Sequence, residues 1–247
     1  MISLLANPLR FLKFAKIARP IFGTAALILI CLGLWFGLWN SPEDYQQGNS
    51  VRIMYVHVPA AWLAMMGYGT MAIVSLIAFI WRHPLADELA KACALPGVSF
   101  TLLALVTGAL WGKTSWGTYW QWDGRLTSFL LLFFLYLGYM SIWNIIEDKK
   151  RAARIAGLVA MVGSINLPII KFSVDWWNSL HQGSTLGSLD APGLPPEMLT
   201  PLLLMVFGYT CFFAWLVLNK MQNKIAQTRK NRKQKTPVVS KITLETL

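Results

Sequence analysis

Charged side chains are scarce in this chain. Only 13% of its 247 residues are Asp, Glu, Lys or Arg, whereas 55% are hydrophobic, and the mean hydropathy is +0.49. So few polar groups cannot cover the surface of a water-soluble globule. The sequence therefore predicts a polytopic membrane protein whose partners include the lipid bilayer.

Acidic residues are the scarcer of the two charged classes. The chain has 11 acids against 22 bases, which gives a net charge of +11. The bases are concentrated at the two ends of the chain and in short loops, a pattern typical of membrane orientation rather than of nucleic-acid binding. No nucleic-acid partner is predicted.

Cysteine is rare, and the common catalytic motifs are missing. Cys31, Cys93 and Cys211 lie in or beside apolar runs and form no CxxC or CxxCH motif. This excludes a local metal clamp and a site for covalent haem attachment, and the three residues are interpreted as small core side chains. The sequence also has no P-loop, no carboxylate dyad and no nucleophile paired with a base in one compartment. No catalytic residue is predicted, and any use of ATP belongs to another chain.

Long apolar runs are abundant. The first run, of 19 residues, would span roughly 28 Å as a helix, close to the thickness of the hydrocarbon core. It lacks a cleavage site with small residues, so we expect a retained helix rather than a signal peptide. The predicted fold class is all-α with six transmembrane helices, at about residues 21–39, 59–81, 92–110, 127–146, 155–170 and 201–218. Asn166 and Pro168 interrupt the fifth.

The distribution of basic residues predicts the orientation. All but four of the 22 lysines and arginines fall in the amino-terminal segment, two alternate loops and the tail. By the positive-inside rule, both termini are cytoplasmic. Residues 7–19 are expected to lie on the cytoplasmic surface as a basic amphipathic segment. Residues 1–220 are expected to form the membrane domain, and 221–247 a basic cytoplasmic tail too polar to pack.

Aromatic residues crowd the segment 111–127, which contains the sequence WGTYWQWDGR at 116–125. Trp and Tyr favour the membrane surface in any membrane protein, so an aromatic belt is one interpretation. A belt does not explain an Asp-x-Arg directly after the last Trp, and a flat platform for a ligand is the other. If 116–123 were helical, Trp116, Tyr119, Trp120 and Asp123 would share one face, although Gly117 and Gly124 weaken that helix. Asp123 is expected to bond Arg125 or loop amides, because a carboxylate at the membrane edge needs a partner.

Two of the three histidines fall on the same predicted side as these aromatic residues. His57 is expected at the mouth of the second helix, just before Pro59, and His181 follows the fifth helix; His83 lies on the cytoplasmic side and is interpreted as a structural residue at a helix end. Haem is a ligand that takes two imidazoles and offers a flat apolar face to indoles. Its propionates would need cations. The candidates on this side are Arg125, Lys113, Arg52 and Lys171.

Three sequence blocks resemble one known family. WGTYWQWDGRLT at 116–127 is similar to the signature of the tryptophan-rich WWD haem-handling proteins. VRIMYVHVPAAW at 51–62 and FSVDWWNSLHQGST at 172–185 resemble the haem exporter protein C branch, also called cytochrome c maturation protein C. The resemblance covers roughly residues 10–220. Tyr119 is a small departure, since the family more often has Trp at this position.

The resemblance implies a role in cytochrome c biogenesis at the periplasmic face of a bacterial inner membrane. Haem b would be bound non-covalently with His57 and His181 as axial ligands. The surface that contacts haem and partner would comprise Trp116, Gly117, Tyr119, Trp120, Trp122 and Asp123. Implied partners are the haem chaperone protein E, the single-helix protein D and the ABC transporter subunits A and B. The chain would handle and deliver haem without being an enzyme.

Two other functions remain open from the residues alone. A permease would move haem across the bilayer, but polar residues that mark a pathway are few in the predicted helices. A b-type redox protein would carry paired histidines deep within helices, whereas here one histidine lies at each of two helix ends.

Overall fold

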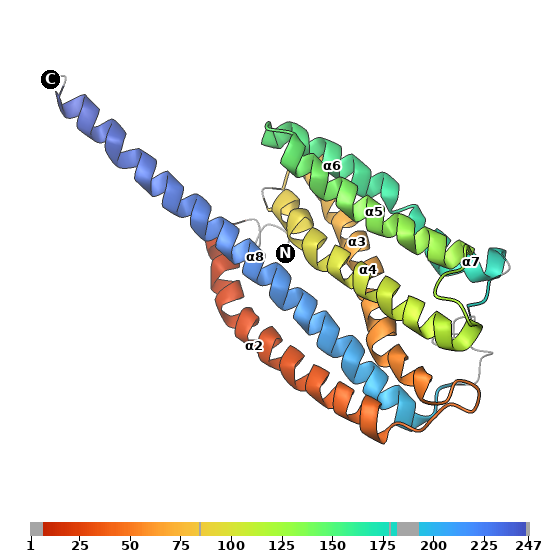
Figure 1. Cartoon of the computed structure of the whole chain (residues 1–247). Helices are drawn as coiled ribbons and strands as arrows, with labels where there is room; N and C mark the ends of the chain where they lie inside the picture. Colours follow the sequence, from red (N-terminus) through yellow and green to blue (C-terminus); the bar gives the residue numbers. More distant parts are fainter. Residues whose placement is uncertain (1–6, 84, 178, 182–192, 246–247) are drawn as a thin grey trace.

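The structure is a computed structural model, and it describes residues 7–83, 85–177, 179–181 and 193–245 (Figure 1). Within this part of the chain all regular elements are helical. They are α2 (Pro8–Trp35), a π-helical turn η1 (Phe36–Asn40), a 3₁₀ turn η2 (Asn49–Ile53), α3 (Met54–Trp81), α4 (Ala86–Trp116), α5 (Gly124–Ile145), α6 (Lys149–Gly163), α7 (Asn166–Trp176) and α8 (Pro196–Glu245).

The described helices form six spans that are long and apolar enough to cross a membrane. The shortest, α5, has 22 residues and is roughly 33 Å long, which suffices for the hydrocarbon core. The α6 and α7 helices together make the fifth span, with a break at Ser164 and Ile165. The all-α class, the six spans and the interruption near Asn166 are therefore confirmed, while the side on which the termini lie stays a prediction.

Two helices begin earlier than the hydropathy predicts. The basic segment 7–19 is continuous with the first span, because Asn7 accepts a hydrogen bond from the Leu9 amide (2.9 Å) and Pro8 begins α2. It is not a separate surface helix. Similarly, α3 begins at Met54 directly after the 3₁₀ turn, so Pro59 lies inside the helix and His57 in its first turn rather than before it.

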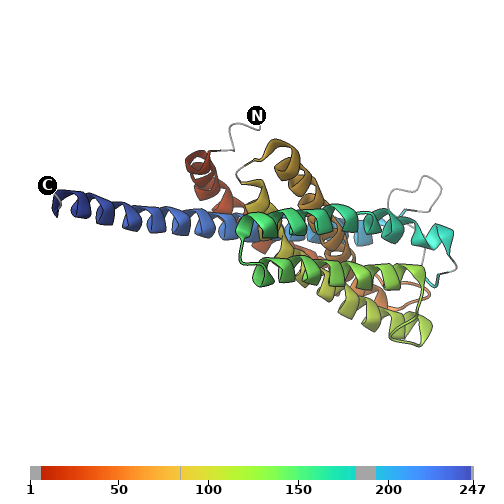
Figure 2. The same cartoon turned by 90° about the horizontal axis from the view of Figure 1, so that it is seen from above.

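Aromatic and small residues pack closely between the helices, whose arrangement Figure 2 shows from above. In the main core, Tyr68 and Tyr136 meet edge to face with ring centroids 5.0 Å apart, and the Tyr136 hydroxyl donates to the Ala64 carbonyl (2.8 Å). On α6 the fully buried side chains are Ala152, Ala156 and Ala160. This spacing lets neighbouring helices approach closely, as is usual within membranes.

The ends of the bundle differ in chemistry. One, called here the aromatic end, carries the starts of α3, α5 and α8 and the ends of α4 and α7. The opposite, basic end carries the start of α2, the α3–α4 and α5–α6 loops and the outer part of α8 (Figure 1).

The last helix does not stop where its apolar run stops. It continues through Lys220, and Met221 (2% exposed) and Ile225 (6%) belong to the main core before the helix leaves the bundle (Figure 1). The expectation that the tail packs against nothing from 221 onward is therefore wrong for these two residues. They alternate with polar ones at helical spacing, so one face of the segment remains apolar. The division of the chain into a membrane domain and a tail stays a prediction.

Candidate functional site

His57 is held by α4. Its Nδ1 donates to the Ala104 carbonyl (3.0 Å) and lies 3.1 Å from the Thr107 hydroxyl, which itself donates to the Leu103 carbonyl. Every hydrogen bond of this imidazole to the described residues uses Nδ1. The proton therefore sits on Nδ1, and the lone pair of Nε2 is free to bind a metal.

The packing around His57 leaves the ring little room. A Cβ atom at Gly108 would lie 2.9 Å from His57 Cε1, so only glycine allows the ring to approach α4 this closely. Trp111 meets the imidazole edge to face, with centroids 5.7 Å apart, and its own Nε1 donates to Gln47 Oε1 (2.6 Å). The ring is thus fixed from two sides.

His181 is oriented by a carboxylate. Its Nδ1 donates to Asp123 Oδ2 (2.8 Å), and the Ser179 hydroxyl donates to the same oxygen (2.8 Å). Trp116 lies against the ring at 4.7 Å between centroids. As with His57, the bonded atom within the described residues is Nδ1. A carboxylate bonded to the far nitrogen of a histidine fixes the tautomer and makes Nε2 a stronger metal ligand.

Asp123 also begins α5. It is 7% exposed, and its Oδ1 accepts the Leu126 amide (2.8 Å) as the N-cap of the helix. Burial alone would raise the pKa of this carboxyl, but hydrogen bonds from Leu126, Ser179 and His181 lower it below its ordinary value. Asp123 therefore bonds an amide in the first turn of α5 rather than the loop amides expected, and Arg125 interacts with it only electrostatically.

His181 is uncharged near neutral pH. Burial lowers its pKa below the ordinary value, and the opposing effect of Asp123 is smaller. A neutral imidazole is the form that binds metals.

The two histidines lie at the same end of the bundle. His57 packs on the last turns of α4, and His181 contacts the final residue of α4 and the N-cap of α5. The loop that brings His181 here rests on Gly124, where a Cβ atom would lie 2.9 Å from Trp177.

The aromatic residues do not share a helical face. The α4 helix ends at Trp116, because Gly117 adopts a left-handed conformation (φ 77°) and bonds back to the Lys113 carbonyl (3.2 Å). Residues 117–123 are irregular, so the predicted helical spacing is wrong. Trp120 meets Trp122 edge to face at 5.4 Å, while Trp122 (74%) and Tyr119 (58%) are largely exposed.

The four candidate cations are not equivalent. The guanidinium of Arg52 donates to the carbonyls of Leu38 (2.8 Å) and Ser41 (3.0 Å), so it anchors the preceding loop. Lys113 donates to the Gly117 carbonyl (2.9 Å).

Of the four candidates, Arg125 is the one whose charge acts on both His57 and His181. It donates to the carbonyl of Lys171 (3.4 Å), the fourth candidate. Its Nε and the Nε1 of Trp120 are buried donors without a hydrogen-bond partner among the described residues. Buried donors are rarely left unpaired, so an acidic ligand fits here.

Several supporting residues were missed from the sequence. Ala104, Thr107 and Gly108 lie within an apolar run and give no polar pattern of their own. Ser179 could have been found, because a serine side chain often accepts a hydrogen bond from the backbone amide two residues later, as it does here from His181 (3.1 Å). His83, at the opposite end, accepts a hydrogen bond on Nδ1 from the Leu85 amide (3.3 Å).

Known proteins of one family are similar in sequence to this chain. The chain matches the family described as Heme exporter protein C over residues 1–236. It is similar to Heme exporter protein C of Bradyrhizobium diazoefficiens, with 51% identity over 225 residues that cover 91% of this chain and 85% of the relative. The Haemophilus influenzae protein is 47% identical and covers 81% of each chain, and the Escherichia coli protein is 42% identical, covering 98% of this chain and 96% of its own. The chain belongs to the Heme exporter protein C family.

Proposed function

We propose that this chain binds haem at the aromatic end, between Nε2 of His57 and Nε2 of His181, and delivers it for cytochrome c biogenesis. The observation that carries the proposal is the shared arrangement of the two imidazoles. Each is held through Nδ1 by a protein acceptor, so each offers Nε2 as a ligand. The names of the relatives support haem as the cargo.

The residues fit haem better than a free metal ion. Among the described residues, no group of three or more His, Cys, Asp or Glu could hold an ion. Two imidazoles suffice for haem iron, because the macrocycle fills the other positions. Trp111, Trp116 and Trp120 supply apolar surface, and the unpaired donors of Arg125 and Trp120 suit its carboxylates.

The exposed aromatics suit transfer to a partner. Trp122 and Tyr119 are mostly uncovered at the rim of the site, and exposed aromatic residues are enriched at protein interfaces. The recipient we propose is the periplasmic chaperone protein E, with protein D and ABC subunits A and B completing the assembly. The aromatic end then faces the periplasm and both termini face the cytoplasm. Haem would be of b type and non-covalent, since the chain has no CxxCH motif. No catalytic residue is assigned.

Absorption spectra of the purified chain test this proposal. We expect the protein to carry haem with a low-spin spectrum of two histidine ligands. His57→Ala and His181→Ala should each lower retained haem or open one axial position. His83→Ala is the matched control and should leave the spectrum unchanged. If both site variants keep the wild-type spectrum, the assignment of ligands is wrong.

Transport across the bilayer is a second candidate, because the relatives are named as exporters. Asn166, a polar side chain buried at the break between α6 and α7, is the observation within the spans that favours it. Uptake of haem into sealed vesicles that contain this chain alone would support a permease. A lack of uptake, together with haem bound at the histidines, would support delivery.

A further inference from the structure

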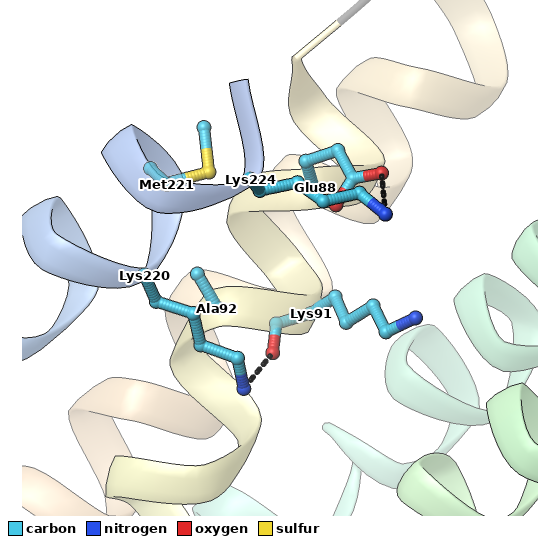
Figure 3. Close-up of a pocket in the computed structure, with 6 residues that line it drawn as sticks. All are labelled: Glu88, Lys91, Ala92, Lys220, Met221 and Lys224. Atoms are coloured by element: carbon cyan, nitrogen blue, oxygen red, sulfur yellow. Dashed lines mark hydrogen bonds and ion pairs between the residues drawn. The ribbon is translucent and has the colours of Figure 1, made fainter. Parts of the chain in front are cut away.

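A small pocket lies at the basic end, away from the histidines. It has a volume of about 80 Å³ and opens between α4 and α8 (Figure 3). Its lining residues are Glu88, Lys91, Ala92, Lys220, Met221 and Lys224. Three of these six are lysines and one is acidic, so the pocket has an excess of positive charge.

The lysine ammonium groups are only partly satisfied by the protein. Lys224 Nζ lies 4.0 Å from Glu88 Oε1, at the outer limit of an ion pair, and both side chains are partly exposed. Lys220 Nζ donates to the Lys91 carbonyl (3.3 Å), a neutral acceptor (Figure 3). An ammonium has three donors, so Lys220 can bond an anion without losing that contact.

The third lysine of the pocket, Lys91, contributes positive charge. The side chain of Lys91 extends to the same side as that of Lys224 and away from that of Lys220 (Figure 3). Its Nζ lies 4.3 Å from the centroid of the Trp143 ring. An anion bonded by the remaining donors of Lys220 would therefore be attracted at longer range by Lys91 and Lys224.

The depth of the pocket is that of lipid headgroups. The apolar run of α8 ends at Leu218, and Lys220 is the first charged residue after it. The polar lining is backed by Ala92 and Met221, both 2% exposed. A phosphate at this level can bond the lysines while its glycerol rests on apolar groups.

An apolar strip leads from the pocket toward the centre of the membrane. Leu95 and Leu102 follow Glu88 at heptad spacing and so share its side of α4. Each is 50% exposed, and no membrane-embedded part of the described chain covers them. Such a strip suits an acyl chain, whereas a free phosphate ion would make no use of it.

We propose that this pocket binds the phosphate of an anionic phospholipid, with Lys220 as the donor and the positive charges of Lys224 and Lys91 adding attraction. Basic pockets between helices at a membrane surface bind anionic lipid headgroups in this way. The inference is independent of haem binding, because the pocket and the histidines lie at opposite ends of the bundle.

Binding of phosphatidylglycerol to the delipidated full chain in detergent tests the proposal. Retained lipid is counted by native mass spectrometry, with phosphatidylcholine and inorganic phosphate as separate probes. We expect wild type to prefer phosphatidylglycerol over phosphatidylcholine, and Lys220→Gln with Lys224→Gln to weaken this binding about tenfold or more. Arg229→Gln with Lys230→Gln is the matched control, since both residues are exposed on the same helix outside the pocket. It should change binding by less than about twofold.

Each other result overturns the proposal. Equal binding of the two lipids would show that the pocket does not select an anion. Equal losses in the two double variants would assign the effect to general surface charge. Competition by inorganic phosphate at the same concentration as the lipid would make a free anion the ligand. A haem spectrum and helical content like those of wild type show that the pocket variant is folded.

Discussion

At the scale of single residues, Asp123 joins three tasks. It begins α5 by accepting the Leu126 amide, it orients His181, and it takes the Ser179 hydroxyl. These bonds use both carboxylate oxygens, and they come from segments that flank the site on two sides. The position of His181, one of the two proposed ligands, therefore depends on a helix cap.

Replacing Asp123 by Asn separates these tasks. Asn caps helices about as well as Asp, so α5 should form normally, whereas the charge behind His181 is lost. We expect haem affinity to fall roughly 10- to 100-fold, the usual effect of removing such a second partner of a metal ligand. Haem titration of the apo-protein measures this. Ser179→Ala, which leaves the carboxylate in place, should lose less; an equal loss would contradict the special role of the charge.

The protonation of His181 predicts a dependence of stability on pH. Burial lowers its pKa below 6.5 in the folded chain, so just below pH 6.5 the unfolded chain binds more protons. Stability should then rise with pH up to about 6.5 and level off above it. The Asp123 carboxyl, whose pKa is also lowered, is fully ionised in this range and adds no slope.

Thermal unfolding of the apo-protein between about pH 5.5 and 7.5 measures this dependence. His181→Asn should show a smaller rise of the unfolding temperature over the acidic half of that range. An identical rise in wild type and variant would mean that His181 does not contribute.

At the scale of elements, α4 is the helix on which both ends of the molecule depend. Its last turns hold His57 through Ala104 and Thr107, and its final residue, Trp116, contacts His181. Its first turns line the lysine pocket. His57 is held by α4 itself and not by the loop 117–123 that follows it. The irregular conformation of this loop therefore does not affect the position of His57.

Gly108→Ala should disturb His57 without removing it. The added methyl would lie 2.9 Å from the imidazole, so the ring must shift away from Ala104 and Thr107. We expect a loss of low-spin haem approaching that of His57→Ala, read from the absorption spectrum. The control is Gly138→Ala in α5, where a Cβ atom meets nothing within 4 Å. If both glycine variants retain haem equally, the close packing at Gly108 is not required.

At the scale of the whole molecule, the two proposed binding sites lie at opposite ends. The aromatic end carries both site histidines and the exposed Trp122, while the basic end carries the lysine pocket and the outer part of α8. Delivery of haem outside the cytoplasm requires that these ends face opposite compartments.

Cysteine labelling in intact cells tests this orientation. In a chain whose native cysteines are replaced by Ser, Gln46→Cys lies in the loop before α3 and Lys230→Cys in the outer part of α8. A maleimide that cannot cross the inner membrane should label position 46 and not position 230 until the membrane is broken. Labelling of position 230 alone would reverse the proposed topology.

The sequence was sufficient wherever a local pattern controls the structure. Six apolar runs predict six spans, and Asn166 with Pro168 predicts the break in the fifth. The placement of His57 and His181 at one end of the bundle followed from the helix count, because this count determines which loops share a face. That Asp123 has a hydrogen-bond partner followed from the free-energy cost of leaving a buried carboxylate unpaired.

What binds each imidazole was decided by tertiary structure. His57 meets Ala104 and Thr107 across 47 and 50 positions of the chain, and Asp123 meets His181 across 58. A hydropathy profile does not predict such contacts, because an apolar run has the same hydropathy whichever helix it packs against. Gly117 likewise ends α4 by adopting a left-handed backbone conformation, which the spacing of the neighbouring Trp and Tyr residues does not predict. The sequence by itself determined the number of spans and the end of the bundle at which His57 and His181 lie. Only the packing of α3 on α4 decided which nitrogen of His57 remains free, because a backbone carbonyl of one helix reaches the ring of the other.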